Sequence, residues 1–170
     1  MTNKRQVSPD KLYKFLQEHN IMDYVLSRYM GVSESIVRGC FKHDLNRHGK
    51  PLQFSPENIQ KMNDALPRLA ADIRACELHF GQGETFTNRC GRQYDRSIAD
   101  QVKAGMTRFF SIKDITARVL GWKWTKCRAR LSCTTHPSYS LVSREDCDRL
   151  NDELTAVASV LDSYHVVVDQ

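Results

Sequence analysis

The stretch YVLSRYMGVSESIVRGCF (Tyr24–Phe41) decides the fold of this chain, because a later stretch repeats its pattern. When Gly31 is aligned with Gly121, the first stretch lies over DITARVLGWKWTKCRARL (Asp114–Leu131). In this alignment arginine falls on arginine twice, and apolar residues largely match apolar residues. A pattern that recurs at a fixed spacing indicates two related structural units in one chain.

The repeat continues after a connection that is two residues shorter in the second copy. SPENIQKMNDALPRLAADI (Ser55–Ile73) then lies over SREDCDRLNDELTAVASVL (Ser143–Leu161), and nine of the 37 aligned positions are identical. We therefore expect one unit over residues 1–75, a linker over residues 76–97 and a second unit over residues 98–170.

Both units have the apolar spacing and the capping residues of helices. Ser8, Ser33 and Asp23 are expected to cap helices, and Gly31 supplies the positive φ of a tight turn. The expected helices cover residues 10–19, 23–30, 33–42 and a segment opening at 55, then 98–108, 112–120, 124–131 and 143–161. Pro67 is expected to bend or divide the fourth helix.

Two short helices that cross at a glycine turn make specific demands on packing. A small residue is needed four positions before the glycine, where Ser27 and Ala117 lie. An apolar residue must fill the inner face of the second helix, and Val37 and Cys127 occupy that place. Trp122 is expected to be buried beside its glycine.

Here LSRYMGVSESIVRGCF, and more loosely TARVLGWKWTKCRARL, resemble the lambda-repressor-like (XRE/Cro-type) family, whose pattern is LAxxLGVSxSTVSRxxxG. The resemblance implies a mainly α fold with two tandem helix-turn-helix units and a small β element at their junction. The chain departs from the family at Thr116 and Trp122, and its loops over residues 43–54 and 132–142 are longer.

In that family the second helix of the motif enters the major groove of DNA. The residues expected to contact DNA are Ser33, Glu34, Ser35, Arg38, Lys42, Lys123, Trp124, Thr125, Lys126, Arg128 and Arg130. Arginine can donate two hydrogen bonds to guanine. The alternative for Arg38 and Arg128 is an ion pair on the protein surface. Trp124 either touches DNA or packs on the protein, and Glu34 either accepts from cytosine or complements the helix dipole.

Charge is unevenly distributed along the chain, whose net charge is +5. The segment Lys113–Leu131 carries six Lys and Arg residues and one acid, whereas Glu145–Gln170 carries seven acids and one arginine. A basic stripe of this kind is typical of a protein that binds a polyanion. The alternative is a solvent-exposed helix face that binds no partner.

The linker changes from helical to strand-like periodicity. ELHF and TFTN are expected to form strands around Gly81-Gln82-Gly83, and the chain end SYHVVVDQ reads as a strand that could pair with ACELHFGQ. Arg89, Arg92 and Arg96 form either a basic arm reaching phosphate or a solvated linker.

Several classes of function find no support in the sequence. Catalytic motifs are absent, so we expect no enzyme and no cofactor. Six scattered cysteines are expected to be buried, with zinc at Cys40-His43-His48 or Cys127-Cys133-His136 as the alternative. The chain has no membrane-length apolar run and no signal peptide, so we expect no membrane partner and a cytoplasmic, nucleoid-associated location.

The sequence therefore predicts a sequence-specific double-stranded DNA-binding protein, a transcriptional regulator acting as a single-chain pseudo-dimer on an asymmetric site. A protein–protein interaction module on the same helices is the alternative. Single-strand or RNA binding through Trp124 and Tyr139 is a weaker one. Self-association as a homodimer stays open.

Overall fold

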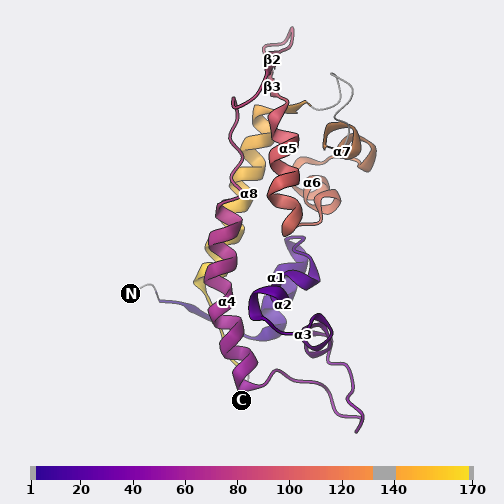
Figure 1. Ribbon diagram of the computed structural model, residues 1–170, viewed down its shortest axis with the longest axis vertical. Coiled ribbons are helices and arrows are strands. Elements are labelled where there is room, and N and C mark those ends of the chain that lie inside the picture. Colours follow the sequence, from indigo (N-terminus) through magenta and orange to yellow (C-terminus); the bar gives the residue numbers. More distant parts are fainter. Residues whose placement is uncertain (1–2, 132–140, 169–170) are drawn as a thin grey trace. The chain divides into compact units, whose positions relative to one another are not determined.

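The structure is a computed structural model, and it describes residues 3–131 and 141–168. The described chain is mainly α-helical with two small sheets (Figure 1), as the helical periodicity predicts. Cys133, His136 and Tyr139, named above for zinc and for stacking, lie outside the described residues.

Helices begin and end close to the expected positions. The first half of the chain contains α1 (Pro9–Glu18), α2 (Asp23–Met30), α3 (Glu34–Phe41) and α4 (Pro56–Arg74). The second half contains α5 (Ser97–Ala104), the 3₁₀ helix η1 (Met106–Arg108), α6 (Ile112–Leu120), α7 (Trp124–Leu131) and α8 (Arg144–Ser163). Since α4 continues through Pro67, the proline does not divide it.

Side-chain caps explain where several helices start. The Ser8 hydroxyl accepts a hydrogen bond from the Lys11 amide, and Ser33 accepts from the Ile36 amide. Asp23 was expected to cap α2, but this is wrong. The capping position is Met22, which makes no side-chain bond, and Asp23 instead accepts from the Gln17 amide group.

The first sheet joins segments from opposite ends of the chain. Strand β1 (Arg5–Val7) pairs in parallel with β5 (Tyr164–Val166), and Val7 and Val166 are buried. The chain end is therefore a strand, as expected, but its expected partner is wrong. The repeat suggested that SYHVVVDQ could pair with ACELHFGQ, whereas the strand paired with β5 is β1.

The second sheet lies in the linker, with one strand displaced from its expected position. It has the order β2 (Thr85–Thr87), β3 (Gln93–Asp95), β4 (Val142–Ser143), and all its pairs are antiparallel. TFTN supplies β2, but ELHF forms no strand, so the predicted hairpin around Gly81-Gln82-Gly83 is wrong. The hairpin instead turns at residues 88–92.

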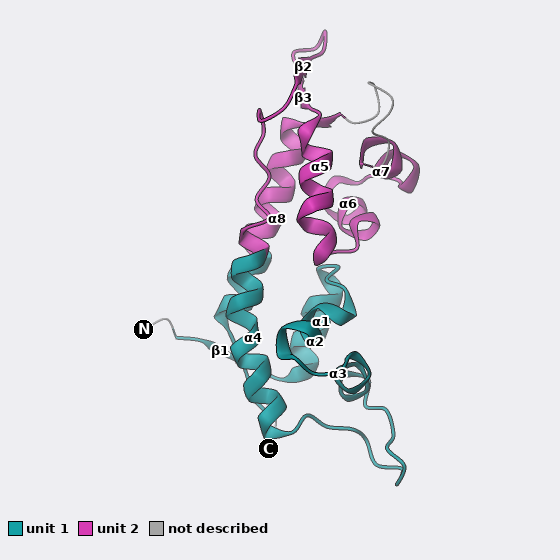
Figure 2. Cartoon of the chain, viewed as in Figure 1, with its two compact units in different colours: residues 1–72, 157–170 teal, residues 73–156 magenta. Residues whose placement is uncertain are grey.

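The chain divides into two compact units, shown in different colours in Figure 2. Unit 1 consists of Met1–Asp72 together with Val157–Gln170, and unit 2 is Ile73–Ala156. These boundaries differ from the expected 1–75, 76–97 and 98–170, because the end of α8 and strand β5 belong with the first unit. Within the described residues, no helix is both long and apolar enough to cross a membrane.

Candidate nucleic-acid interface

In unit 1, α2 and α3 meet at a glycine in the left-handed conformation. Gly31 has φ 67° and ψ 29°, and its amide bonds back to the last turn of α2. Val37 on the inner face of α3 is 1 % exposed. Phe41, at the end of α3, stacks on Tyr13 with ring centroids 4.7 Å apart. These contacts fix α3 against its unit and leave its opposite face to solvent.

The joint between α6 and α7 in unit 2 has the same backbone conformation. Gly121 has φ 67° and ψ 22°. Trp122 is 4 % exposed and Cys127 is 3 % exposed, so both residues are buried as expected. Cys127, which aligns with Val37, therefore fills the inner face of α7 as Val37 fills that of α3.

The two joints differ at the small residue expected where the helices cross. Ser27 is buried, and its hydroxyl donates to the Tyr24 carbonyl at 2.7 Å. Ala117, the corresponding residue, is exposed, so the expectation is wrong for the second copy. Thr116, the residue before it, is buried, and its hydroxyl donates to the Ile112 carbonyl at 2.7 Å. Leu26, which aligns with Thr116, is buried as well, so the two joints differ in the exposure of the residue four positions before the glycine.

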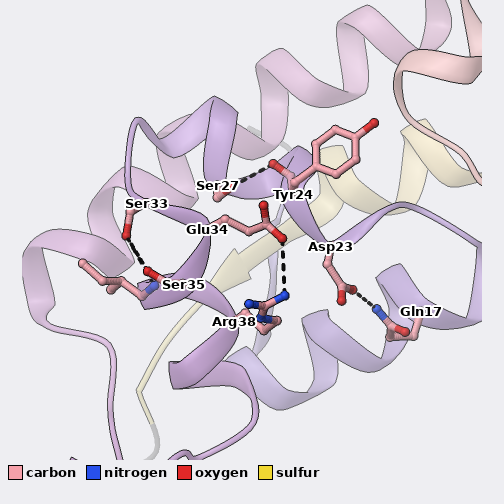
Figure 3. A network of polar contacts seen from close by, with 9 residues as sticks. Gln17, Asp23, Tyr24, Ser27, Ser33, Glu34, Ser35 and Arg38 are labelled. Carbon is pink, nitrogen blue, oxygen red and sulfur yellow. Dashed lines mark hydrogen bonds and ion pairs between the residues drawn. The ribbon is translucent and has the colours of Figure 1, made fainter.

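All five residues predicted to contact DNA from the region of α3 are exposed, and they are Ser33, Glu34, Ser35, Arg38 and Lys42. The Ser33 and Ser35 hydroxyls lie 3.2 Å apart. Arg38 Nη1 lies 3.6 Å from Glu34 Oε1, with about half of each side chain exposed (Figure 3). The ion pair that the sequence left open for Arg38 is present, and such exposed pairs contribute only about 0.2–1 kcal/mol.

Five of the six predicted residues around α7 are exposed, and they are Lys123, Trp124, Thr125, Lys126 and Arg128. Arg130, the sixth, is half-buried. Trp124 is 48 % exposed, and the Lys113 ammonium lies 5.9 Å from its ring centroid. The Lys126 ammonium lies 5.2 Å from the ring centroid of Trp122. The exposed residues around α7 are therefore three cations, one indole and one threonine.

The first turn of α7 differs from that of every other α-helix in the described residues, because it carries no acid. Acids are favoured at helix N-termini, where they complement the partial positive charge of the helix dipole. Lys123 and Lys126 oppose that dipole, so stability alone does not account for them. An external anion at the same end would complement both the dipole and the lysines.

Not every cation of the basic stripe belongs to this surface. Arg118, on α6, is ion-paired with Glu153 on α8, and that carboxylate is only 14 % exposed. The pair holds two helices of unit 2 together, so Arg118 serves the fold. The sequence did not predict this ion pair, because its two partners are 35 positions apart.

The candidate zinc ligands of unit 1 are engaged in other contacts. Burial raises the pKa of the Cys40 thiol. His43 Nε2 lies 3.0 Å from Asp10 Oδ1, and His48 Nε2 accepts a hydrogen bond from Arg47 Nε. In the described part of the chain, no three His, Cys, Asp or Glu side chains are grouped as metal ligands.

Cysteine burial matches the expectation with one exception. Among the described cysteines, Cys40, Cys76, Cys127 and Cys147 are buried. Cys90 is exposed in the turn between β2 and β3, so the expectation is wrong there.

Two exposed cations that were not predicted as site residues lie in the loop after α3. Arg47 and Lys50 are both exposed at a tight turn. The overlooked signal was an asparagine, Asn46, three residues before Gly49, which is a frequent turn pattern.

Comparison with known proteins gives no relative from which a function could be carried over. No family model, no curated protein and no solved structure matches this chain.

Proposed function

We propose that this protein binds double-stranded DNA sequence-specifically, with α3 and α7 as the recognition helices of two helix-turn-helix units. The observation that carries the proposal is the exposed face of α7. It presents Lys123, Lys126 and Arg128 at and after the start of a helix whose first turn has no acid. Phosphate is the partner that such a face fits.

The unit that carries α7 supplies most of the electrostatic attraction. Lys123 and Lys126 contact phosphates, which adds affinity for any sequence. Arg128, exposed one turn into α7, is in a position to hydrogen-bond guanine O6 and N7 in the major groove.

The unit that carries α3 adds discrimination between sequences. The ion pair between Arg38 and Glu34 has to break before Arg38 can bind a base. The exposed ion pair is worth about 0.2–1 kcal/mol, whereas a bidentate contact with guanine is worth about 1–3 kcal/mol. The exchange therefore favours DNA on the correct sequence. Because α3 and α7 carry different side chains, the preferred site has two unlike half-sites, as for a regulator acting as a single-chain pseudo-dimer.

The alternative is that the same helices bind another protein. Two large apolar side chains support it, because Ile36 is 49 % exposed and Trp124 is 48 % exposed. The Glu34–Arg38 pair also lowers the charge of the α3 face. The lysines of α7 oppose it, since charged side chains are depleted at the centre of protein interfaces.

A salt series distinguishes the two functions. Affinity of the full chain for a mixed-sequence duplex falls on a log–log plot with a slope of about −0.9 per neutralised phosphate. Lys123→Ala and Lys126→Ala should each make that slope shallower by about 0.9 and weaken all duplexes alike. Lys103→Ala, which removes an exposed cation from α5 in the same unit, is the matched control and should leave the slope unchanged.

Two results would contradict the proposal. One is a wild-type chain without salt-dependent affinity for duplex DNA. The other is a slope that responds to Lys103→Ala as strongly as to Lys126→Ala, since this would indicate attraction by net charge alone.

A further inference from the structure

Two exposed turns in different units share a five-residue pattern. The first is Asn46-Arg47-His48-Gly49-Lys50 in unit 1, and the second is Asn88-Arg89-Cys90-Gly91-Arg92 in unit 2. Both read Asn-Arg-x-Gly followed by Lys or Arg. We call them the first and second basic tips. Figure 2 shows each reaching outward from its own unit.

The first basic tip is closed by hydrogen bonds to one asparagine. The side-chain oxygen of Asn46 accepts from the His48 amide at 2.8 Å and from the Lys50 amide at 3.1 Å. The Gly49 amide donates to the Asn46 carbonyl at 2.9 Å, and the Asn46 amide donates to the Lys50 carbonyl at 2.8 Å. Gly49 has φ 70°, which a glycine adopts without strain.

The second basic tip repeats every one of these bonds. The side-chain oxygen of Asn88 accepts from the Cys90 amide at 3.0 Å and from the Arg92 amide at 2.9 Å. The Gly91 amide donates to the Asn88 carbonyl, and the Asn88 amide donates to the Arg92 carbonyl, both at 3.0 Å. Gly91 has φ 78°. The backbone therefore presents the second and fifth side chains of both tips in the same way.

The internal repeat does not explain the shared pattern. Gly121 follows Gly31 by 90 positions, whereas Asn88 follows Asn46 by only 42. The first tip comes after α3 of unit 1, and the second comes before α5 of unit 2. The two tips thus occupy different positions in their units, and the internal repeat does not account for the pattern that they share.

Turn geometry explains only half of the pattern. Asparagine at the first position and glycine at the fourth are favoured in such turns. The backbone hydrogen bonds of the turn require neither arginine at the second position nor a cation at the fifth, and the one side-chain bond of Arg47, to His48, is exposed. All four cations are exposed, and neither five-residue tip contains an acid.

Both tips have firmly anchored bases. In unit 1 the Asp44 amide donates to the Gly39 carbonyl of α3 at 2.9 Å, and a Cβ at Gly39 would lie 3.0 Å from Leu52 Cδ1. In unit 2 the fully buried Asp95 carboxylate accepts from the amides of Gly81 and Ser97. Anchored bases reduce the entropy lost when the tip cations bind a partner.

We infer that the two basic tips are phosphate-binding arms that contact the backbone of double-stranded DNA. Arg47 and Lys50 form one pair of donors, and Arg89 and Arg92 form the other. Arg92 also lies 3.7 Å from Glu145, but both side chains are more than half exposed, so phosphate can replace that carboxylate. The inference rests on the proposed DNA binding and adds to it two contact sites outside the recognition helices.

Paired substitutions in the full chain test the inference. Arg47→Ala/Lys50→Ala and Arg89→Ala/Arg92→Ala should each make the log–log salt slope shallower by about 1.8, at about 0.9 per phosphate. Both should weaken chosen and scrambled duplexes by the same factor, because phosphate contacts carry no base preference. Lys11→Ala/Lys14→Ala in unit 1 and Lys103→Ala/Arg149→Ala in unit 2 remove two exposed cations from helices and should leave the slope near the wild-type value.

The outcomes separate this inference from the proposed function. If Lys126→Ala flattens the slope but a tip pair behaves like its control, the tips are not phosphate-binding arms. The proposal that α7 binds DNA then still stands. If a tip pair changes the preferred base at one position, the tip reads bases and the phosphate assignment is overturned. If a tip pair weakens a structured RNA but not the duplex, the DNA assignment is overturned. If the wild-type chain has no affinity for duplex, both proposals fail together. Unchanged helical circular dichroism shows that a variant is folded.

Discussion

Gly31 and Gly121 set the direction of the chain between the helix pairs α2–α3 and α6–α7. Both have φ 67°, and a Cβ added at either glycine would meet no atom within 4 Å. The cost of a side chain there is therefore conformational and not steric. Since the left-handed region costs an L-residue roughly 1–2 kcal/mol, the two positions should respond alike to the same substitution.

Gly31→Ala and Gly121→Ala should each lower the free energy of unfolding by about 1–2 kcal/mol. Gly31→Asn and Gly121→Asn should cost less, because asparagine enters the left-handed region more readily than alanine. Urea unfolding followed by circular dichroism measures both effects. Alanine substitutions that leave the midpoint unchanged would contradict the observed turn conformation.

The thiols of unit 2 should differ in their response to pH. Burial raises the pKa of Cys147 to about 11, with a smaller contribution from Asp148, whereas Cys90 is exposed. The thiolate is the reactive form, so Cys147 stays protonated and slow to alkylate as the pH rises from about 7 to 9. Peptide mass spectrometry should find Cys90 labelled within that range and Cys147 labelled only after unfolding. Equal labelling rates at the two cysteines would exclude the buried position of Cys147.

Exposure of single residues follows well from the sequence where helical spacing determines it. Val37 and Cys127 are buried as predicted, because they occupy the inner positions of short amphipathic helices. Polar partners are less predictable. Nothing local in the sequence reveals that Arg118 pairs with Glu153, or that Asp23 accepts from Gln17 instead of capping its helix.

At the scale of elements, each long helix carries one asparagine whose side chain bonds to the backbone of a segment outside the helices. Asn63 on α4 accepts from the Val166 amide at 2.7 Å and donates to the Val166 carbonyl at 2.9 Å. Asn151 on α8 accepts from the Leu78 amide at 2.7 Å and donates to the Leu78 carbonyl at 2.8 Å. The two asparagines are aligned by the internal repeat, and so are the two segments they bind.

Asn63→Ala and Asn151→Ala should therefore destabilise the protein by similar amounts, about 1–3 kcal/mol each. Each leaves a backbone amide and a carbonyl without their partner in a partly buried place. Aspartate at either position can still accept from the amide but cannot donate to the carbonyl, so it should not restore full stability. Thermal unfolding of the four variants checks this, and a large effect at only one asparagine would contradict the equivalence of the two contacts.

Helices were predictable because capping residues and apolar periodicity are local signals. The short strands were not. β1 and β5 have three residues each and pair across nearly the whole chain, so no local pattern marks them as partners. ELHF resembles a strand because polar and apolar residues alternate in it and Leu78 is buried, yet the Leu78 backbone bonds to the Asn151 side chain and not to a strand.

At the scale of the whole molecule, unit 1 is completed by residues from the end of the chain. The segment Val157–Gln170 belongs to it and includes the buried residues Val157, Leu161 and Val166. Burying each aliphatic side chain of this kind contributes about 1.5–3 kcal/mol. The sequence could not reveal this division, because the repeat assigns α8 and everything after it to the second copy.

A chain that ends at Ala156 should therefore lose the stability of unit 1. Both tryptophans, Trp122 and Trp124, lie in unit 2, so their fluorescence reports on that unit alone. Circular dichroism of the shortened chain should show part of the helix melting early, while the tryptophan transition persists. An unchanged circular dichroism midpoint would show that unit 1 does not need the segment.

Selection of binding sites from a pool of random duplexes tests the central claim most directly. We predict that the wild-type chain enriches one asymmetric site, that Arg128→Ala relaxes a single base position in it, and that Arg38→Ala relaxes a different one. Lys103→Ala should select the wild-type site unchanged. A pool that gains no common sequence, or the same site from wild type and both arginine variants, would contradict the assignment of α3 and α7 as recognition helices.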